Sequence, residues 1–308
     1  MKRFHAGLLA LGALCSGAAS TAALAQAAAP ADEPKIAETA TEVRLRVFSD
    51  RRVGGVSETF RKPGAELHVE AAHASGLVGV AELATVSKFS YPQGDGYTVL
   101  LAGGYRWGDP DRWHFGAGAA HEMFPGSKVT DAPTGFDETF TPTGTLNFDF
   151  DTSYALFEFG FGAVEARYLY VVSKDFRGAN TAGVCGTFLT FALPTGDPQA
   201  IGNALNCYAR GDLRSRGTQL LDVDYKYPLD GRTTLLAHAG IKRVKNFSEA
   251  DMSDWKVGVQ HKRWGVDWIA EVVGANVKAP ELYSATNNSG ETRRLDTTAL
   301  LLTLSYTF

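Results

Sequence analysis

The sequence has little of the hydrophobicity that a helical membrane protein needs. After Ala25, no stretch stays apolar for the roughly 18 residues of a spanning helix, and the mean hydropathy of the chain is slightly negative, at -0.12. Basic residues are not in excess either, since 30 Lys and Arg stand against 34 Asp and Glu. The sequence therefore argues against a bundle of membrane helices and against nucleic acid as a partner.

Residues that would carry chemistry are also scarce. The motif Gly-x-Ser-x-Gly is absent and no Ser, His and acid grouping points to a hydrolase, so no catalytic residue is expected. His68, His114 and His238 fall on the same face of the predicted strands, but no two share a metal-ligand spacing. We therefore expect neither a metal site nor a cofactor.

Cysteine is nearly absent, with three residues in 308, and Cys15 lies in an apolar N-terminal segment. Cys185 and Cys207 remain as the only other pair, and in an oxidising compartment such a pair is expected to form a disulfide. The residues between them include Pro194, Gly196 and Gly202, a composition that predicts a loop throughout.

The N-terminal segment has the pattern of a secretory signal. Lys2 and Arg3 precede an uncharged, small and apolar run from Ala6 to Ala25, which ends in the small-x-small sequence Ala23-Leu24-Ala25. Its Gly, Ser and Thr content is too high for a membrane anchor. We predict a signal peptide over residues 1–25, a disordered leader over 26–40 and the folded domain over 41–308.

Beyond residue 41 the chain alternates between apolar and polar residues. Val43, Leu45 and Val47 share one face of a predicted strand while Arg44 and Arg46 share the other, and the pattern recurs along the chain. Period two alone fits a soluble sandwich as well as a membrane barrel. We count about twelve segments, with ten or fourteen left open, near 42–53, 63–74, 77–88, 95–107, 112–122, 144–160, 163–175, 216–229, 232–245, 253–263, 266–278 and 295–308.

Three features favour an all-β fold, a transmembrane antiparallel up-and-down β-barrel. Tight turns such as Asp230-Gly231 alternate with longer polar connections, and aromatic residues gather near strand ends. The last segment is amphipathic and ends in Tyr306 and Phe308, which are expected to act as the signal for the barrel assembly machinery. An even number of strands would put both termini in the periplasm.

The polar face of the predicted strands would line the barrel interior. We expect the pore-lining residues to be Arg44, Arg46, Glu66, His68, Glu70, Arg106, Asp149, Asp151, Glu165, Arg167, Asp222, Asp224, Lys226, His238, Lys242, Lys256, Asp267 and Glu271. Either these charges line a narrow conducting passage, as a barrel of about twelve strands allows, or they pair with one another and fill a closed interior.

Two stretches resemble a known family. The segment 49–76 is similar to the opening of the TorF-type porins of proteobacteria, and 253–259, SDWKVGV, is similar to a late strand of that family. The matching residues are Ser49-Asp50, Gly55-Val56-Ser57, Pro63, His73 and Ser75-Gly76. Two features depart from the pattern: Gly54 stands where an Arg is expected, and the Cys185 to Cys207 segment is an insertion. The resemblance implies an outer-membrane barrel with a pore-like role.

Together these observations predict a porin-like channel of the bacterial outer membrane that passes small hydrophilic solutes by diffusion. Its expected partners are outer-membrane lipid, the assembly machinery and the solutes. Three alternatives remain: a non-conducting structural or adhesion barrel, a barrel enzyme, and a soluble secreted enzyme.

Overall fold

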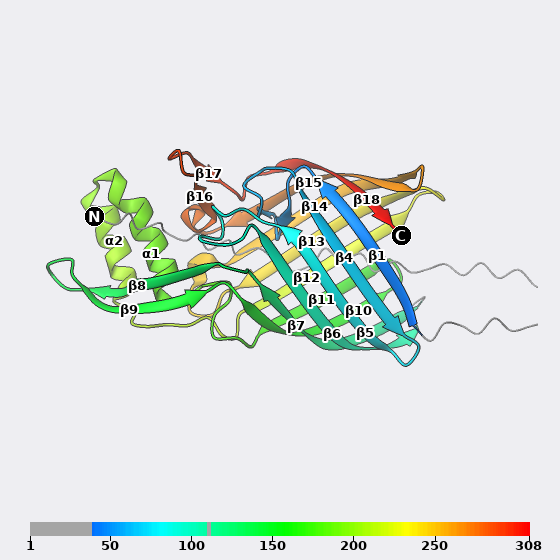
Figure 1. The fold of residues 1–308 in the computed structure, drawn as a ribbon, viewed down its shortest axis with the longest axis horizontal. Helices are drawn as coiled ribbons and strands as arrows, with labels where there is room; N and C mark the ends of the chain where they lie inside the picture. The colour runs from blue at the N-terminus through cyan, green and yellow to red at the C-terminus, as the bar shows by residue number, and fades with distance from the viewer. Residues whose placement is uncertain (1–38, 110–111) are drawn as a thin grey trace, which may run out of the picture.

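The computed structural model describes residues 39–109 and 112–308 and contains a closed β-barrel. Twelve strands of the described chain form it, each antiparallel to its neighbours, and β1 closes the ring by pairing with both β4 and β18. Figure 1 shows these strands inclined to the long axis of the barrel. The predicted fold class is confirmed. The predicted signal peptide and most of the predicted leader lie outside the described residues, while β1 begins at Thr39, within the range expected for the leader.

The barrel strands are 8 to 13 residues long, the length that tilted membrane strands require. In chain order they are β1 Thr39–Phe48, β4 Gly64–His73, β5 Leu77–Thr85, β6 Tyr97–Asp109, β7 Trp113–Met123, β10 Thr152–Phe161, β11 Val164–Val171, β12 Gln219–Pro228, β13 Thr233–Arg243, β14 Met252–Arg263, β15 Val266–Val277 and β18 Ala299–Thr307.

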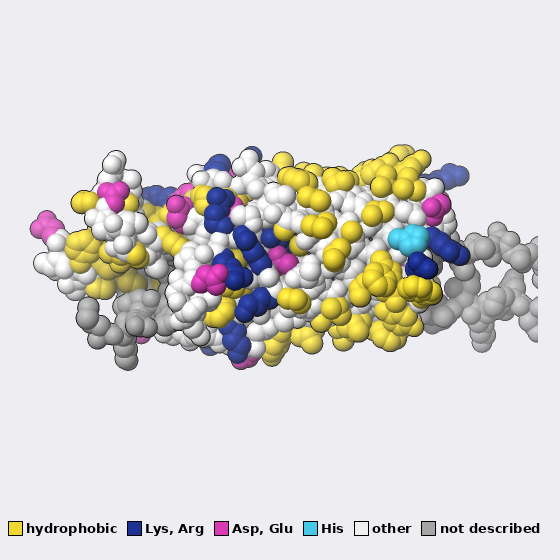
Figure 2. All heavy atoms as spheres, turned by 90° about the horizontal axis from the view of Figure 1, so that it is seen from above, with side chains coloured by type: hydrophobic (Ala, Val, Ile, Leu, Met, Phe, Trp, Pro, Cys, Tyr) yellow, Lys and Arg dark blue, Asp and Glu magenta, His cyan; other side chains and the backbone are white. Residues whose placement is uncertain are grey.

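The alternating sequence puts apolar side chains on the outside of this barrel. Leu45, Val257 and Leu300 are among the large apolar residues that are 41 to 65% exposed, and Figure 2 shows such side chains covering the barrel body, with charged ones concentrated toward one end. A closed barrel leaves no unpaired strand edge, and an apolar outer face is stable only in lipid. The fold therefore places the protein in the bacterial outer membrane.

Aromatic side chains mark one border of the apolar belt. They lie on the outer face beside the short turns, where amphipathic rings meet lipid headgroups. The exposed members are Tyr105, Trp107, Trp113, Phe115, Phe161, Tyr225, Tyr227, Trp264, Trp268 and Tyr306. Neighbouring rings are in contact, with centroids 5.4 Å apart for Trp113 and Phe115 and 4.9 Å apart for Tyr306 and Phe308.

The two ends of the barrel differ. Five short connections, such as Trp264-Gly265 between β14 and β15, join strands at what we call the short-turn end. All the longer connections lie at the opposite end, here called the long-loop end, and carry the remaining elements: β2 Arg52–Val53, β3 Val56–Ser57, β8 Lys128–Phe136, β9 Pro142–Asp149, α1 Thr181–Ala192, α2 Pro198–Tyr208, β16 Ser284–Thr286 and β17 Thr292–Arg294, with 3-10 turns at 193–195, 248–250 and 280–283. No helix in the described chain is long and apolar enough to cross a membrane.

The single strand predicted over residues 144–160 is wrong. The structure divides it into β9, which pairs with β8 outside the barrel, and β10, which pairs with β7 and β11 in the wall. The chain bends between them, at residues 150–151. The phenylalanine residues also move from even to odd positions here. Phe148 and Phe150 are buried at the long-loop end, whereas Phe157 and Phe159 face lipid.

The loop predicted around the two cysteines is also wrong, although their disulfide is present, with a Cα–Cα distance of 5.5 Å between Cys185 and Cys207. The segment forms helices α1 and α2. The Asn180 side chain caps α1 by accepting from the Gly183 N–H, and Asp197 caps α2 ahead of Pro198. Pro194, Gly196 and Pro198 thus lie at helix ends, whereas Gly202 lies inside α2. The helix pair lies beyond the barrel beside β8 and β9 (Figure 1).

Candidate functional site

The barrel interior is the candidate site. Sixteen of the predicted pore-lining residues lie on barrel strands, and each is buried or half-buried, opposite the lipid-facing positions: Arg44, Arg46, Glu66, His68, Glu70, Arg106, Glu165, Arg167, Asp222, Asp224, Lys226, His238, Lys242, Lys256, Asp267 and Glu271. The other two are not on the wall. Asp149 ends β9, and Asp151 precedes β10, where its carboxylate accepts a hydrogen bond from the Phe124 N–H.

Charges on the wall are paired between strands, some neighbouring and some two strands apart. Arg46 forms an ion pair with Glu66, and Arg106 binds Glu158 at 2.9 Å with Glu70 3.7 Å away. These pairs compensate part of the wall charge locally.

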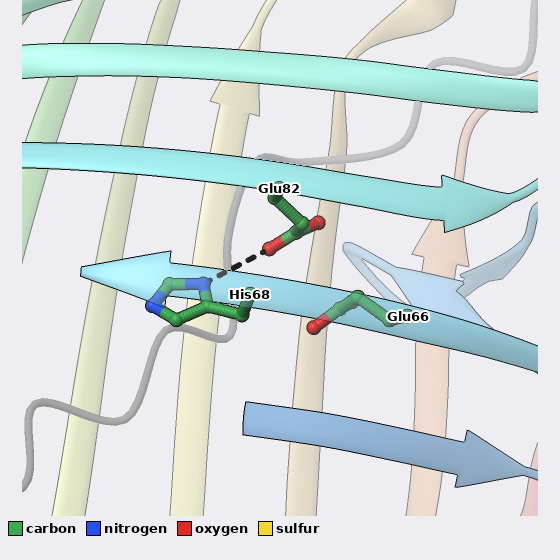
Figure 3. A group of neighbouring side chains, drawn as sticks. All are labelled: Glu66, His68 and Glu82. Atoms are coloured by element: carbon green, nitrogen blue, oxygen red, sulfur yellow. Dashed lines mark ion pairs between the residues drawn. The ribbon is translucent and has the colours of Figure 1, made fainter. Parts of the chain in front are cut away.

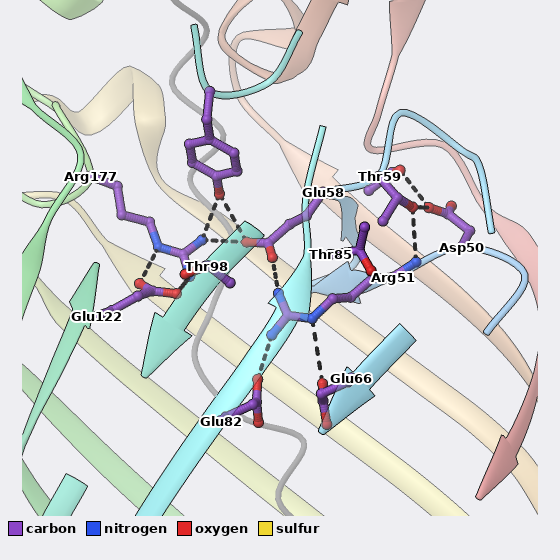
Figure 4. Close-up of polar contacts among 12 residues, drawn as sticks. Asp50, Arg51, Glu58, Thr59, Glu66, Glu82, Thr85, Thr98, Glu122 and Arg177 are labelled. Atoms are coloured by element: carbon purple, nitrogen blue, oxygen red, sulfur yellow. Dashed lines mark hydrogen bonds and ion pairs between the residues drawn. The ribbon is translucent and has the colours of Figure 1, made fainter. Parts of the chain in front are cut away.

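The first long connection, residues 49–63, turns into the barrel and brings Arg51 to the wall. The Arg51 guanidinium forms ion pairs with Glu58 of the same connection, with Glu82 on β5 at 2.6 Å and with Glu66 on β4 at 3.5 Å (Figure 4). Its side chain is 9% exposed and that of Glu58 is fully buried. The strand predicted over 42–53 therefore ends early, at Phe48, and the connection that follows it is anchored inside the barrel mouth.

A second anchor comes from the opposite side of the mouth. Arg177, between β11 and α1, donates from Nε to Glu122 of β7 at 2.8 Å and from Nη1 to Glu58 at 2.7 Å (Figure 4). The Tyr91 hydroxyl also donates to Glu58, at 2.9 Å. Burial disfavours the Arg177 charge, but Glu122, the Tyr91 oxygen and Glu58 outweigh burial and raise its pKa well above the ordinary value, so this guanidinium stays charged.

We name this set of side chains the plug network: Arg51, Glu58, Glu66, Glu82, Tyr91, Glu122 and Arg177. It joins three connections at the long-loop end to strands β4, β5 and β7. Aromatic side chains pack around it, with the Tyr91 and Phe124 rings stacked at 4.0 Å and Phe60, Phe150 and Phe176 almost fully buried. The mouth at this end is therefore filled by protein.

Beneath the plug network lies a cavity of about 130 Å³. Arg51 and Arg52 bound it on the plug side, and wall residues from β1, β4, β5, β12, β13, β14, β15 and β18 surround it, including Glu66, His238 and Glu271. The space is large enough for several water molecules. It is a polar chamber below a closed mouth.

The sequence reasoning missed most of the plug network. Arg51, Glu58 and Arg177 lie in connections, where side chains have no periodicity to show which way they point. Glu82 lies on β5, whose sequence LVGVAELAT has apolar residues on both faces and so does not show which face points inward. Glu122 is in phase with inward positions on β7 and could have been found from alternation alone.

The interior histidines lie apart, each among carboxylates. On β4, His68 has Nδ1 3.6 Å from Glu82 (Figure 3). Its Nε2 lies 3.8 Å from Glu70. His114 lies 3.2 Å from Glu158. His238 has Nδ1 2.8 Å from Asp224 and Nε2 3.0 Å from Asp254.

A closed antiparallel barrel with an apolar belt and a charged interior defines a porin-like barrel of the outer membrane. The chain belongs to the bacterial family described as "Bacterial protein of unknown function (Gcw_chp)", whose model matches residues 33–308. No curated protein matches the sequence significantly.

Solved barrels that are similar in structure include the NanC porin, with 11% identity, 87% of this chain and 98% of that chain covered and a TM-score of 0.44. The KdgM porin in complex with disordered oligogalacturonate shares 8% identity over 88% and 99% of the two chains, with a TM-score of 0.43. A Pseudomonas aeruginosa FadL homologue shares 11% over 88% and 90%, with a TM-score of 0.44. These values are too low to transfer a solute or a mechanism.

Proposed function

We propose that the protein is a porin-like channel through which small hydrophilic solutes diffuse passively across the outer membrane. The observation that carries the proposal is the polar chamber inside an apolar belt: eight barrel strands surround it, and seven of them contribute ionisable side chains to its lining. A chamber of this kind offers hydrated solutes an environment that lipid denies them. The resemblance to TorF-type porins supports the same role, and the protein needs no cofactor and no covalent chemistry for it.

The plug network makes this a restricted channel. In the structure the side chains of Glu58 and Arg177 are fully buried across the mouth, so a solute passes only when the connections at the long-loop end move aside. A twelve-stranded barrel is wide enough for a narrow passage once they do, because eight strands are already filled by wall side chains alone. We expect infrequent openings of low conductance.

Single-channel recording in planar bilayers tests the function. Purified protein that shows heat-modifiable gel mobility, and is therefore folded, should give discrete current steps across a range of salt concentrations. Boiled protein at the same detergent concentration is the control. Complete absence of steps, both from folded wild-type protein and from a variant with a disrupted plug, would refute the channel.

A structural or adhesion barrel is the second candidate, and one feature favours it. The disulfide-linked pair α1 and α2 extends beyond the barrel with β8 and β9 (Figure 1), and the Phe136 ring of β8 packs against Tyr208 of α2 at 5.2 Å. Such a rigid projection is suited to contact other molecules. Cell attachment that is lost on removing residues 181–208, together with an absence of conductance, would select this function.

A further inference from the structure

Two carboxylates meet over a glycine on the inner wall. Asp222 of β12, Gly240 of β13 and Asp254 of β14 lie side by side in register, all facing inward. A Cβ atom on Gly240 would lie 2.9 Å from Asp222 Oδ1 and would collide with the Asp254 carboxylate. The absence of a side chain at Gly240 therefore allows the two carboxylates to approach each other, in spite of their like charge.

His238 completes the group from the next inward position of β13. Its Nε2 lies 3.0 Å from Asp254 Oδ1 and 3.8 Å from Asp222 Oδ1. Asp222 is only 3% exposed, yet its Oδ2 has no hydrogen-bond partner in the described part of the chain. Arg167 of β11 lies opposite Asp222 in register. Leaving a buried carboxylate oxygen unsatisfied is nevertheless costly, so Asp222 has capacity for a further partner, which a cation bound between Asp222, His238 and Asp254 would supply.

The surroundings also fix the orientation of the histidine. His238 Nδ1 lies 2.8 Å from Asp224, and Arg167 holds Asp224 at 2.5 Å. A histidine that binds a metal usually donates its other ring N–H to a carboxylate in this way, which leaves the lone pair of the second nitrogen toward the metal. Here that nitrogen is Nε2, which faces Asp222 and Asp254.

We propose that Asp222, His238 and Asp254 form a binding site for a first-row divalent cation with the preferences of Zn²⁺. In a tetrahedral zinc site with bonds of about 2.0–2.1 Å, ligand atoms lie roughly 3.3 Å apart. The distances of Nε2 from its two carboxylate neighbours bracket this value. One imidazole with two carboxylates suits Zn²⁺ better than Ca²⁺ or Mg²⁺, which take oxygen ligands. His238 lines the chamber, so water can reach the remaining coordination position.

The rival interpretation is a purely ionic cluster. Lys242, the next inward residue of β13 toward the plug, and Lys256, opposite His238 in register, both bring positive charge near the carboxylates. The Lys242 ammonium also lies 5.5 Å from the Phe176 ring and 5.3 Å from the Tyr283 ring. In this interpretation a protonated His238 and these lysines balance the charge and no metal binds.

The group formed by Glu66, His68 and Glu82 is a matched control within the same barrel (Figure 3). It also consists of one histidine and two carboxylates, and all three are buried. However, Glu66 is ion-paired with Arg46 and Arg51, and Arg51 also binds Glu82. Two guanidinium groups already compensate these carboxylates, so this group should not bind a metal.

Cobalt titration of the folded, metal-stripped protein in detergent tests the site, because tetrahedral Co²⁺ has a strong visible absorption that Zn²⁺ abolishes on displacing it. One equivalent of Co²⁺ should bind. Asp222→Asn and His238→Gln should each weaken binding at least about tenfold, while Glu82→Gln should leave it unchanged. Heat-modifiable mobility verifies that each variant is folded, and His238→Gln decides the matter if Asp222→Asn does not fold.

Absence of the absorption band from the wild-type protein would overturn the proposal. Equal Co²⁺ affinity of the wild type and His238→Gln would overturn it as well. So would a loss of Co²⁺ affinity in Glu82→Gln as large as that in His238→Gln. The proposal does not rest on conduction, because the titration gives the same result whether or not the barrel passes solutes.

Discussion

Replacing Arg177 with alanine should open the channel. Arg177 is the side chain through which the connection between β11 and α1 binds both Glu122 of the wall and Glu58 of the first long connection. Removing it breaks the link between two sides of the mouth and leaves the buried Glu122 carboxylate without its ion-pair partner, while Glu58 keeps only Arg51. The conformation with these connections inside the barrel should therefore lose stability relative to one with them outside.

The size of the effect follows from the burial of the pair. The side chains of Arg177 and Glu58 are fully buried and that of Glu122 is 3% exposed. Removing one partner of such a buried ion pair costs about 3–5 kcal/mol, because the remaining charge is left uncompensated. If this free energy destabilises only the closed conformation, the population of the open conformation rises roughly 100-fold or more. Arg177→Lys keeps the positive charge but loses the planar guanidinium that binds two carboxylates at once. Its open probability should therefore lie between those of the wild type and Arg177→Ala.

Single-channel recording measures the open probability of each variant. Arg112→Ala is the matched control, since Arg112 is an exposed arginine whose ion pair with Asp109 lies at the short-turn end, far from the plug. Heat-modifiable mobility must show that all variants are folded. An open probability of Arg177→Ala equal to that of the wild type and of Arg112→Ala would refute the role of the plug network as a gate.

The remaining predictions concern assembly, selectivity and the disulfide. Deleting Phe308 should lower the yield of heat-modifiable barrel in the outer membrane without reducing export, and an unchanged yield would contradict its role as an assembly signal. Changing Arg46 and Arg106 to Glu should shift the reversal potential toward cations, because each change leaves acidic residues unpaired in a narrow passage; an unaltered potential would place the ion path elsewhere. The double change of Cys185 and Cys207 to Ser should leave conductance unchanged, because the helices lie outside the barrel, but should speed proteolysis of residues 181–208, since the cross-link contributes about 3 kcal/mol of loop-closure entropy. A change in conductance would instead show that the helices act on the passage.

The wall of the barrel was predictable because its two faces contact different solvents. Lipid on one side and a polar interior on the other impose a strict alternation, so the facing of Arg44, Asp222 or Leu300 follows from neighbouring residues alone. The same rule failed at residues 144–160 for a physical reason. Both β9 and β10 alternate, but the large apolar residues of β9 pack against protein at the long-loop end, while those on the outer face of β10 contact lipid. The only sign of the break in the sequence is that the phenylalanine residues move from even positions, up to Phe150, to odd positions, from Phe157.

The connections could not be predicted in this way, because tertiary partners far away in the sequence decide their direction. Arg51 and Glu58 are polar residues between strands, a composition typical of exposed loops, yet they are buried by their contacts with Glu82 and Arg177. For the helices, local signals were present in the caps at Asn180 and Asp197, but proline and glycine nearby were interpreted as loop residues.

The width of the barrel explains why the connections turn inward. Side chains of the wall fill an eight-stranded barrel but cannot meet across one of twelve strands. Without the inward connections, carboxylates such as Glu82 and Glu122 would face the mouth with only water to stabilise them. The inward connections supply Arg51 and Arg177 as counter-charges, and their aromatic neighbours exclude water from the mouth. The same wall charges that make the chamber suitable for hydrated solutes therefore hold its entrance closed, and weakening one buried ion pair is the most direct way to separate these two effects.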